Sequence, residues 1–190
     1  MTDQTQTTQP TPEAKPADKP QDKRKTVFLT RLSLTAPCPG ASNIKSTLYW
    51  AVFDGNPRLV VKTNDPADTV SYGKITAAFD PWNVGVIKQT LQKALDAKEA
   101  WKMKVALKNT YRGNQNFDSP QHINDIVIGK DAEGVVYMSV IEQDRPQIKF
   151  PLLPSEYVQY IHADGTPLTP AESSAIFTAG YIDIIIPTIT

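Results

Sequence analysis

The chain has 190 residues, of which 40% are hydrophobic, and it carries 20 basic and 20 acidic side chains. This length and apolar content fit one folded domain, and no apolar run approaches the roughly 18 residues that cross a bilayer, so we expect no membrane segment. The single cysteine, Cys38, excludes an internal disulfide and a cysteine-based zinc site.

The first 25 residues are mainly Thr, Gln, Pro, Asp and Lys, with almost no large apolar side chain. Such a segment cannot bury enough surface to offset the conformational entropy of ordering. We therefore predict a disordered tail at 1–25 and a single domain at 26–190. The start of the chain also lacks the apolar run of a secretory signal peptide, so we expect a cytoplasmic protein.

Alternation of apolar and polar residues predicts a run of β-strands after the tail. The expected strands are from Val27 to the proline-rich loop at 37–40, and then 47–53, 58–63 and 74–79. The segment Asp54-Gly55-Asn56-Pro57 is typical of a turn between two of them. Asp80-Pro81 predicts the start of a helix that continues to about Ala97, because Asp can cap orphan amides and Pro suits the first helical position.

A strand predicted at 101–108 has one apolar face and one basic face. Its lysines are Lys102, Lys104 and Lys108. Two interpretations remain open, because such lysines can bind an anion or can protect an edge strand from aggregation.

The remainder of the chain predicts three more strands and two helices. The strands are expected at 123–128, 135–141 and 147–152, after a polar loop at 112–121. One helix is expected from Pro154 to Ile161, and a Thr169/Glu172 capping box predicts another that ends at Gly180. The apolar residues 181–186 predict a terminal strand, which could join the sheet or a neighbouring subunit, so a homo-oligomer such as a dimer is expected.

These elements predict an α+β fold with antiparallel sheet and helices packed on one face. The order of four strands and a helix occurs at 27–97 and again at 101–162, followed by a helix and strand at 169–187. Since the two segments share almost no side-chain identity, a duplicated module and an ordinary antiparallel sheet both remain open.

The segment Gly73-Lys74-Ile75-Thr76-Ala77-Ala78-Phe79-Asp80-Pro81-Trp82 is a predicted strand that runs into a proline-started helix with an early tryptophan. With this element order, the chain resembles the Whirly and Pur-type families of four strands and a helix. The resemblance implies binding of single-stranded DNA or RNA on a sheet. It has no short motif from which individual binding residues could be transferred.

Charge is distributed unevenly along the chain. Residues 1–112 hold 17 basic and 10 acidic side chains, and residues 113–190 hold 3 and 10, so the two parts carry +7 and −7. The basic part could form an anion-binding surface, or the two parts could neutralise each other across the fold. Cations together with aromatic rings suit single-stranded nucleic acid. The candidates are Tyr49, Trp50, Arg58, Lys62, Tyr72, Lys74, Lys102, Lys104, Lys108, Tyr111 and Arg112.

No sequence pattern indicates catalysis. The two histidines, His122 and His162, are expected at a loop and a helix end, and no phosphate-binding loop, nucleophile elbow or calcium loop is present. We therefore predict a non-enzymatic protein without a cofactor or metal ion.

Two functional hypotheses follow. The first is a sequence-tolerant single-stranded DNA-binding protein of replication or recombination, with RNA as the other strand type. The second is a protein-interaction or structural module, such as a virion component or an inhibitor of a host protein. The Thr/Gln/Pro-rich start resembles phage-encoded proteins, for which the expected location is the host cytoplasm.

Overall fold

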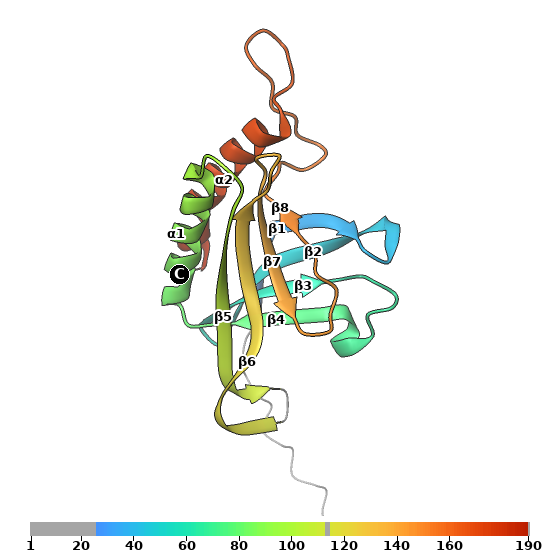
Figure 1. The fold of residues 1–190 in the computed structure, drawn as a ribbon, viewed down its shortest axis with the longest axis vertical. Helices are drawn as coiled ribbons and strands as arrows, with labels where there is room; N and C mark the ends of the chain where they lie inside the picture. The colour runs from blue at the N-terminus through green and yellow to red at the C-terminus, as the bar shows by residue number, and fades with distance from the viewer. Residues whose placement is uncertain (1–25, 113–114, 190) are drawn as a thin grey trace, which may run out of the picture.

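The computed structural model of the protein describes residues 26–112 and 115–189, so the predicted tail at 1–25 lies outside the described residues. The described residues form two four-stranded antiparallel sheets and two α-helices (Figure 1). The predicted α+β class is therefore confirmed. In both sheets the strands follow one another in chain order, so each sheet is a simple meander.

The first sheet contains the strands β1 (Thr26–Cys38), β2 (Ala41–Phe53), β3 (Asn56–Lys62) and β4 (Lys74–Ala78). Asp54 and Gly55 connect β2 to β3, and both have positive φ values, of 50° and 76°. This pair of left-handed residues is the geometry that two-residue hairpin turns require. A short 3₁₀ turn, η1 (Val70–Gly73), precedes β4, and helix α1 (Trp82–Asp96) follows it.

The second sheet repeats this order. It contains the strands β5 (Trp101–Arg112), β6 (Gln115–Lys130), β7 (Val136–Glu142) and β8 (Phe150–Pro151), and helix α2 (Pro170–Ile189) comes after it. Four strands and a helix therefore occur twice. The second copy extends to α2, beyond the predicted boundary at residue 162.

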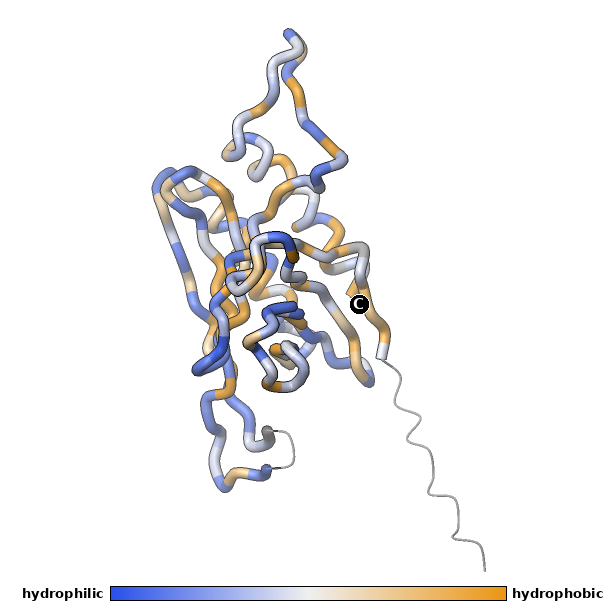
Figure 2. Tube along the Cα trace, turned by 90° about the vertical axis from the view of Figure 1, so that its right-hand side faces the viewer, coloured by the Kyte–Doolittle hydropathy of each residue, from blue (hydrophilic) through white to orange (hydrophobic). Residues whose placement is uncertain are grey.

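The main core lies between the facing sides of the two sheets and the two helices, which pack together on one side of the molecule (Figure 1), and Tyr49, Ala51 and Val60 form a small second cluster. Strand side chains alternate between faces, so every second residue points into this core. In Figure 2 the hydrophobic segments gather in the middle of the molecule, whereas the projecting β5–β6 hairpin is mostly hydrophilic. The largest fully buried side chains include Trp50, Leu59, Ile87, Ile126, Met138, Phe150 and Ile185.

The predicted strand at 181–186 is wrong, because α2 continues through Gly180 to the end of the described chain. Its β-branched isoleucines favour a strand locally. The buried residues Ser174, Thr178, Tyr181, Ile182 and Ile185 nevertheless recur at helical spacing. Packing of this face against the core decides the conformation. No helix in the described residues is both long and apolar enough to span a membrane.

The predicted helix from Pro154 to Ile161 is also wrong. This segment contains turns and a single isolated bridge from Ile161 to Pro167. Tyr157, Val158 and Ile161 remain exposed, so a helix here would have no apolar surface to cover.

Two predicted local features also differ from the structure. The polar segment expected as a loop at 112–121 forms strand from residue 115 on, while 113–114 lie outside the described residues. The N-cap residue of α1 is Pro81 and not Asp80, and the helix begins there without a side-chain capping hydrogen bond. The capping box at α2 is confirmed, since the Thr169 amide donates to Glu172 Oε2 at 2.9 Å and the Glu172 amide donates to Thr169 Oγ1 at 3.3 Å.

Candidate nucleic-acid interface

Four of the predicted binding residues lie on one face of the first sheet. Alternate residues of β2, β3 and β4 point into the core, which leaves Tyr49, Arg58, Lys62 and Lys74 on the opposite, outer face. Lys62 and Lys74 are cross-strand partners, and both side chains are exposed. The outer face therefore carries a cationic edge formed by two adjacent strands.

Aromatic rings lie beside these cations on the outer face. Phe28 and Tyr49 pack edge to face with ring centroids 6.0 Å apart, and the Arg58 guanidinium lies 4.2 Å from the centre of the Phe53 ring. Burial raises the pKa of Tyr49 and lowers the pKa of Arg58. Tyr49 is buried, with an exposed fraction of 8%, so a base cannot stack on its ring in this structure, and Arg58 partly covers the Phe53 ring.

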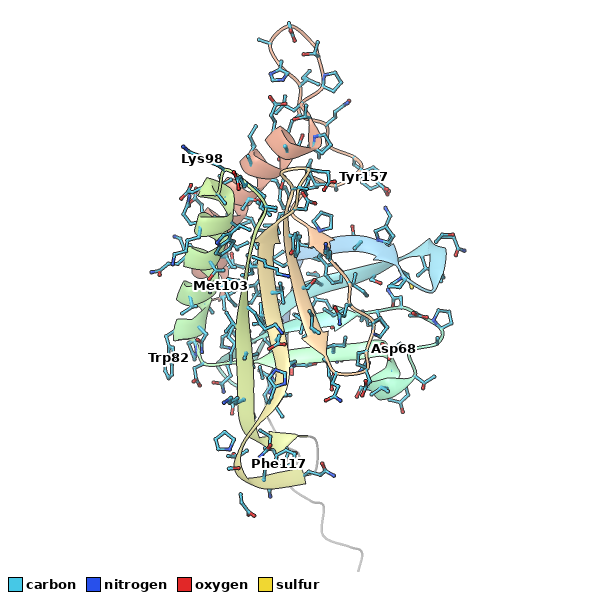
Figure 3. All side chains as sticks on the ribbon, in the orientation of Figure 1. Asp68, Trp82, Lys98, Met103, Phe117 and Tyr157 are labelled. Carbon is cyan, nitrogen blue, oxygen red and sulfur yellow. The ribbon has the colours of Figure 1, made fainter. Side chains whose placement is uncertain are left out.

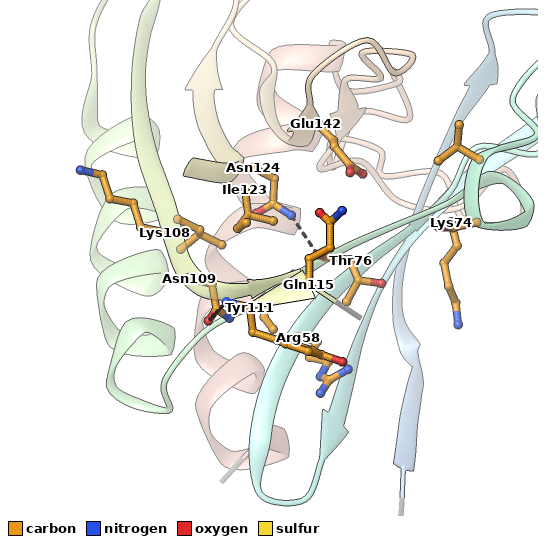
Figure 4. Close-up of a pocket in the computed structure, with 14 residues that line it drawn as sticks. Arg58, Lys74, Thr76, Lys108, Asn109, Tyr111, Gln115, Ile123, Asn124 and Glu142 are labelled. Atoms are coloured by element: carbon orange, nitrogen blue, oxygen red, sulfur yellow. Dashed lines mark hydrogen bonds between the residues drawn. The ribbon is translucent and has the colours of Figure 1, made fainter. Parts of the chain in front are cut away.

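A groove of about 650 Å³ lies where the outer face of the first sheet meets the β5–β6 hairpin (Figure 4). It brings together predicted residues that are far apart in the chain, such as Arg58 and Tyr111. In Figure 4, Tyr111 and Gln115 lie toward Arg58 and Thr76, whereas Lys108 extends away from them. The lining residues are Arg58, Val70, Ser71, Lys74, Thr76, Ala78, Leu107, Lys108, Asn109, Tyr111, Gln115, Ile123, Asn124 and Glu142.

The wall of this groove retains unused hydrogen-bonding capacity. Asn124 Nδ2 donates to the Thr76 carbonyl at 2.8 Å, which fixes the orientation of the amide group. Among the described residues, Asn124 Oδ1 and Arg58 Nε are buried and have no hydrogen-bond partner. Unpartnered buried polar atoms are uncommon in folded proteins, and here two of them belong to lining residues of one groove.

A second groove of about 500 Å³ lies on the outer face of the second sheet and contains Lys102 and Lys104. Tyr137 and Lys149 also line it, with Lys149 Nζ 5.0 Å from the centre of the Tyr137 ring. A Cβ on Gly129 would lie 2.8 Å from the Tyr137 hydroxyl, so the ring covers the glycine. Sequence reasoning missed Tyr137 and Lys149, although the alternation in Ile148-Lys149-Phe150 already placed the lysine opposite two apolar residues.

One lysine of this second face is already paired within the protein. Lys104 Nζ and His122 Nε2 each lie 2.8 Å from a carboxylate oxygen of Asp125. Burial by itself raises the pKa of Asp125, but the hydrogen bonds from Lys104 and His122 outweigh it and lower the pKa overall. The positive charge of the second face is therefore partly neutralised.

The remaining predicted residues have different environments. Trp50 is fully buried and its Nε1 donates to the Tyr181 hydroxyl at 2.7 Å, so a ligand cannot reach it and it belongs to the core. Tyr72 is fully exposed in η1, and Tyr111 is half-exposed on the hairpin. Arg112 ends β5, and its side chain is not among those described.

Comparison with known proteins gives no match: no family model fits the chain, and no curated protein or solved structure shows significant similarity to it. The resemblance to Whirly and Pur-type proteins therefore remains a prediction from element order.

In the part of the chain that the structure describes, no group of three or more His, Cys, Asp or Glu side chains has the geometry of a metal site. Cys38 is buried at the end of β1. His162 lies 3.7 Å from Glu172 of the α2 capping box.

Proposed function

We propose that the protein binds single-stranded nucleic acid, in the first place DNA, with little dependence on base sequence. The observation that supports this most is the groove at the meeting point of the two repeats. It combines the cations Arg58 and Lys74 with the aromatic side chain of Tyr111, and Lys62 extends the cationic edge along the outer face. A flexible polyanion with exposed bases suits such a surface, because phosphates need cations and bases need flat rings.

The proposed sequence tolerance has a physical basis. Contacts of lysine and arginine with phosphates carry no base information, and every base can stack on an aromatic ring. The biological role we propose is coating of single strands during replication or recombination. It requires neither a catalytic group nor a cofactor.

A fluorescence anisotropy titration tests this proposal. Fluorescein-labelled dT and rU oligomers of about 20 nucleotides are titrated with full-length protein at low salt. We expect binding in the micromolar range or tighter, and Lys74→Glu should weaken it at least tenfold, because it reverses a charge at the groove. The matched control is Lys98→Glu, which changes another exposed lysine, just beyond the end of α1 (Figure 3). Lack of binding by the wild-type protein contradicts the proposal.

The second candidate is a protein-interaction module, and exposed apolar side chains on the two helices favour it. Trp82 and Val86 lie one helical turn apart on α1, with exposed fractions of 71% and 39%, and Ile176 and Ile184 of α2 are about half exposed. Trp82 stands at the start of α1 on the outside of the molecule (Figure 3). Light scattering of the wild type and of Trp82→Ala tests whether this surface holds subunits together. A monomer in both cases would argue against self-association through the helices.

A further inference from the structure

The loop between β3 and β4 holds two consecutive non-glycine residues in a left-handed conformation. Ser71 has φ and ψ values of 49° and 34°, and Tyr72 has 56° and 42°. Side chains with a Cβ rarely adopt this region, because it brings Cβ close to the backbone. Such residues persist only where the surroundings over-determine the backbone, and they concentrate at functional sites.

The ring of Tyr72 gains nothing from this conformation within the protein. Its side chain is fully exposed, at 101% of the reference value, so no described residue covers it. A tyrosine turned entirely into water leaves a large apolar ring unburied. Tyr72 therefore has both an unfavourable backbone conformation and an unfavourable side-chain environment.

A buried ion pair from the other repeat holds the loop in place. Arg145, which follows β7, places Nε 2.8 Å from Asp68 Oδ1, and its Nη2 donates to Asp68 Oδ2 at 2.8 Å. Thr63 Oγ1 also donates to Asp68 Oδ2, at 2.7 Å. Both charged side chains are almost completely buried, with exposed fractions of 4% and 2%. Asp68, which is labelled in Figure 3, therefore connects the start of the 68–73 segment to the residues that follow β3 and β7.

The loop lies at the candidate nucleic-acid groove. Val70 and Ser71 form part of the groove lining, and Lys74 follows two residues after Tyr72. Tyr72 itself is not a lining residue, but in the chain it lies between the lining residues Ser71 and Lys74.

We infer that Tyr72 is a pre-formed stacking residue for a nucleobase, and that Asp68 and Arg145 are the positioning residues that hold it. This inference rests on the proposed binding of single-stranded nucleic acid. Holding the ring before the ligand arrives removes the ordering cost from the binding step. The ligand class is thereby specified further, since a polyanion without bases would gain nothing from Tyr72.

The test compares a dT oligomer with an abasic oligomer of the same length and charge. Tyr72→Ala should weaken binding of dT by about 5- to 150-fold, the range for one stacked base, and leave binding of the abasic oligomer unchanged. Tyr72→Phe should bind dT as the wild type does, because it keeps the ring. Tyr157→Ala is the matched control, since Tyr157 is 89% exposed in the segment between β8 and α2, which Figure 3 shows apart from Asp68.

The positioning role is tested by Asp68→Asn and by Thr63→Val, a milder change of similar volume that removes the hydroxyl shared between Asp68 Oδ2 and the Gly73 carbonyl. Each should weaken binding of dT but not of the abasic oligomer, and neither should weaken dT binding further when Tyr72 is already alanine. A folding defect would weaken binding of both oligomers together. Equal losses of affinity for dT and for the abasic oligomer would therefore overturn the positioning role.

The outcomes separate this inference from the proposed function. If the wild type binds dT and Tyr72→Ala binds it equally well, stacking on Tyr72 is refuted while nucleic-acid binding stands. If the wild type binds neither oligomer, the proposed function fails and the inference fails with it.

Discussion

Neutralising the outer face of the first sheet should change the salt dependence of binding by a calculable amount. The variant carries Arg58→Gln, Lys62→Gln and Lys74→Gln, which removes three cations from adjacent strands. Each phosphate contact on a single strand contributes about 0.7 to the slope of log affinity against log salt, so three contacts contribute about 2. Between about 50 and 200 mM salt, these three contacts account for roughly a 20-fold loss of wild-type affinity. Over the same range, the affinity of the variant should therefore fall about 20-fold less than that of the wild type.

The assay is the anisotropy titration repeated at four or five salt concentrations. The control triple variant carries Lys88→Gln, Lys93→Gln and Lys98→Gln on α1 and just after it, and it has the same net charge as the test variant. We expect the control to keep the wild-type slope. A test variant with an unchanged slope would refute the assignment of phosphate contacts to this face, and an equal change in both variants would indicate only a general charge effect.

Three further predictions concern stability. Tyr181→Phe leaves the buried Trp50 indole N–H without its acceptor and should cost about 1–3 kcal/mol in the free energy of urea unfolding. Gly134→Ala should cost about 1–3 kcal/mol, because its φ is +83° and a Cβ would lie 2.9 Å from the Ala171 side chain. Gly180→Ala, in open space within α2, should instead stabilise by about 0.5–1 kcal/mol, and equal effects of the two glycine changes would contradict this reasoning. Burial by itself raises the pKa of Asp68, but its hydrogen bonds lower it overall, so its ion pair stabilises fully above about pH 4 and is lost as pH falls further. Asp68→Asn should therefore cost about 3–5 kcal/mol at neutral pH and show a shallower decline of stability in acid, measured by denaturation at several pH values.

Two adjacent residues of β2 show which part of the binding-site prediction the sequence could not decide. Tyr49 and Trp50 were both candidates, yet consecutive strand residues point to opposite faces, so only one of them could lie on the outer face. The alternation of β2 does not say which face is covered by the second sheet and the helices. That choice appears only in the folded structure, where Trp50 lies in the main core and Tyr49 is buried in a small second cluster on the outer face.

The lysines of β5 illustrate a second limit. Their exposure follows from period two and was correctly predicted, but Lys102 and Lys104 line the second groove whereas Lys108, after a register shift, lines the first. The partner of Lys104 was not predictable, because Asp125 becomes its neighbour only through the register of β5 with β6. The groove itself joins residues of both repeats, and no local pattern relates Arg58 to Tyr111.

By itself, the sequence determined the features that depend on neighbouring residues: the alternation of the strands, the Asp54-Gly55 turn, the start of α1 and the capping box of α2. Local backbone preferences and short-range hydrogen bonds are sufficient for these. Only the tertiary structure decided that residues 181–189 are helical, which aromatic rings are buried, and which cations meet at one groove. Those outcomes depend on burial against distant segments, and the free energy of that packing exceeds the local preferences of the residues concerned.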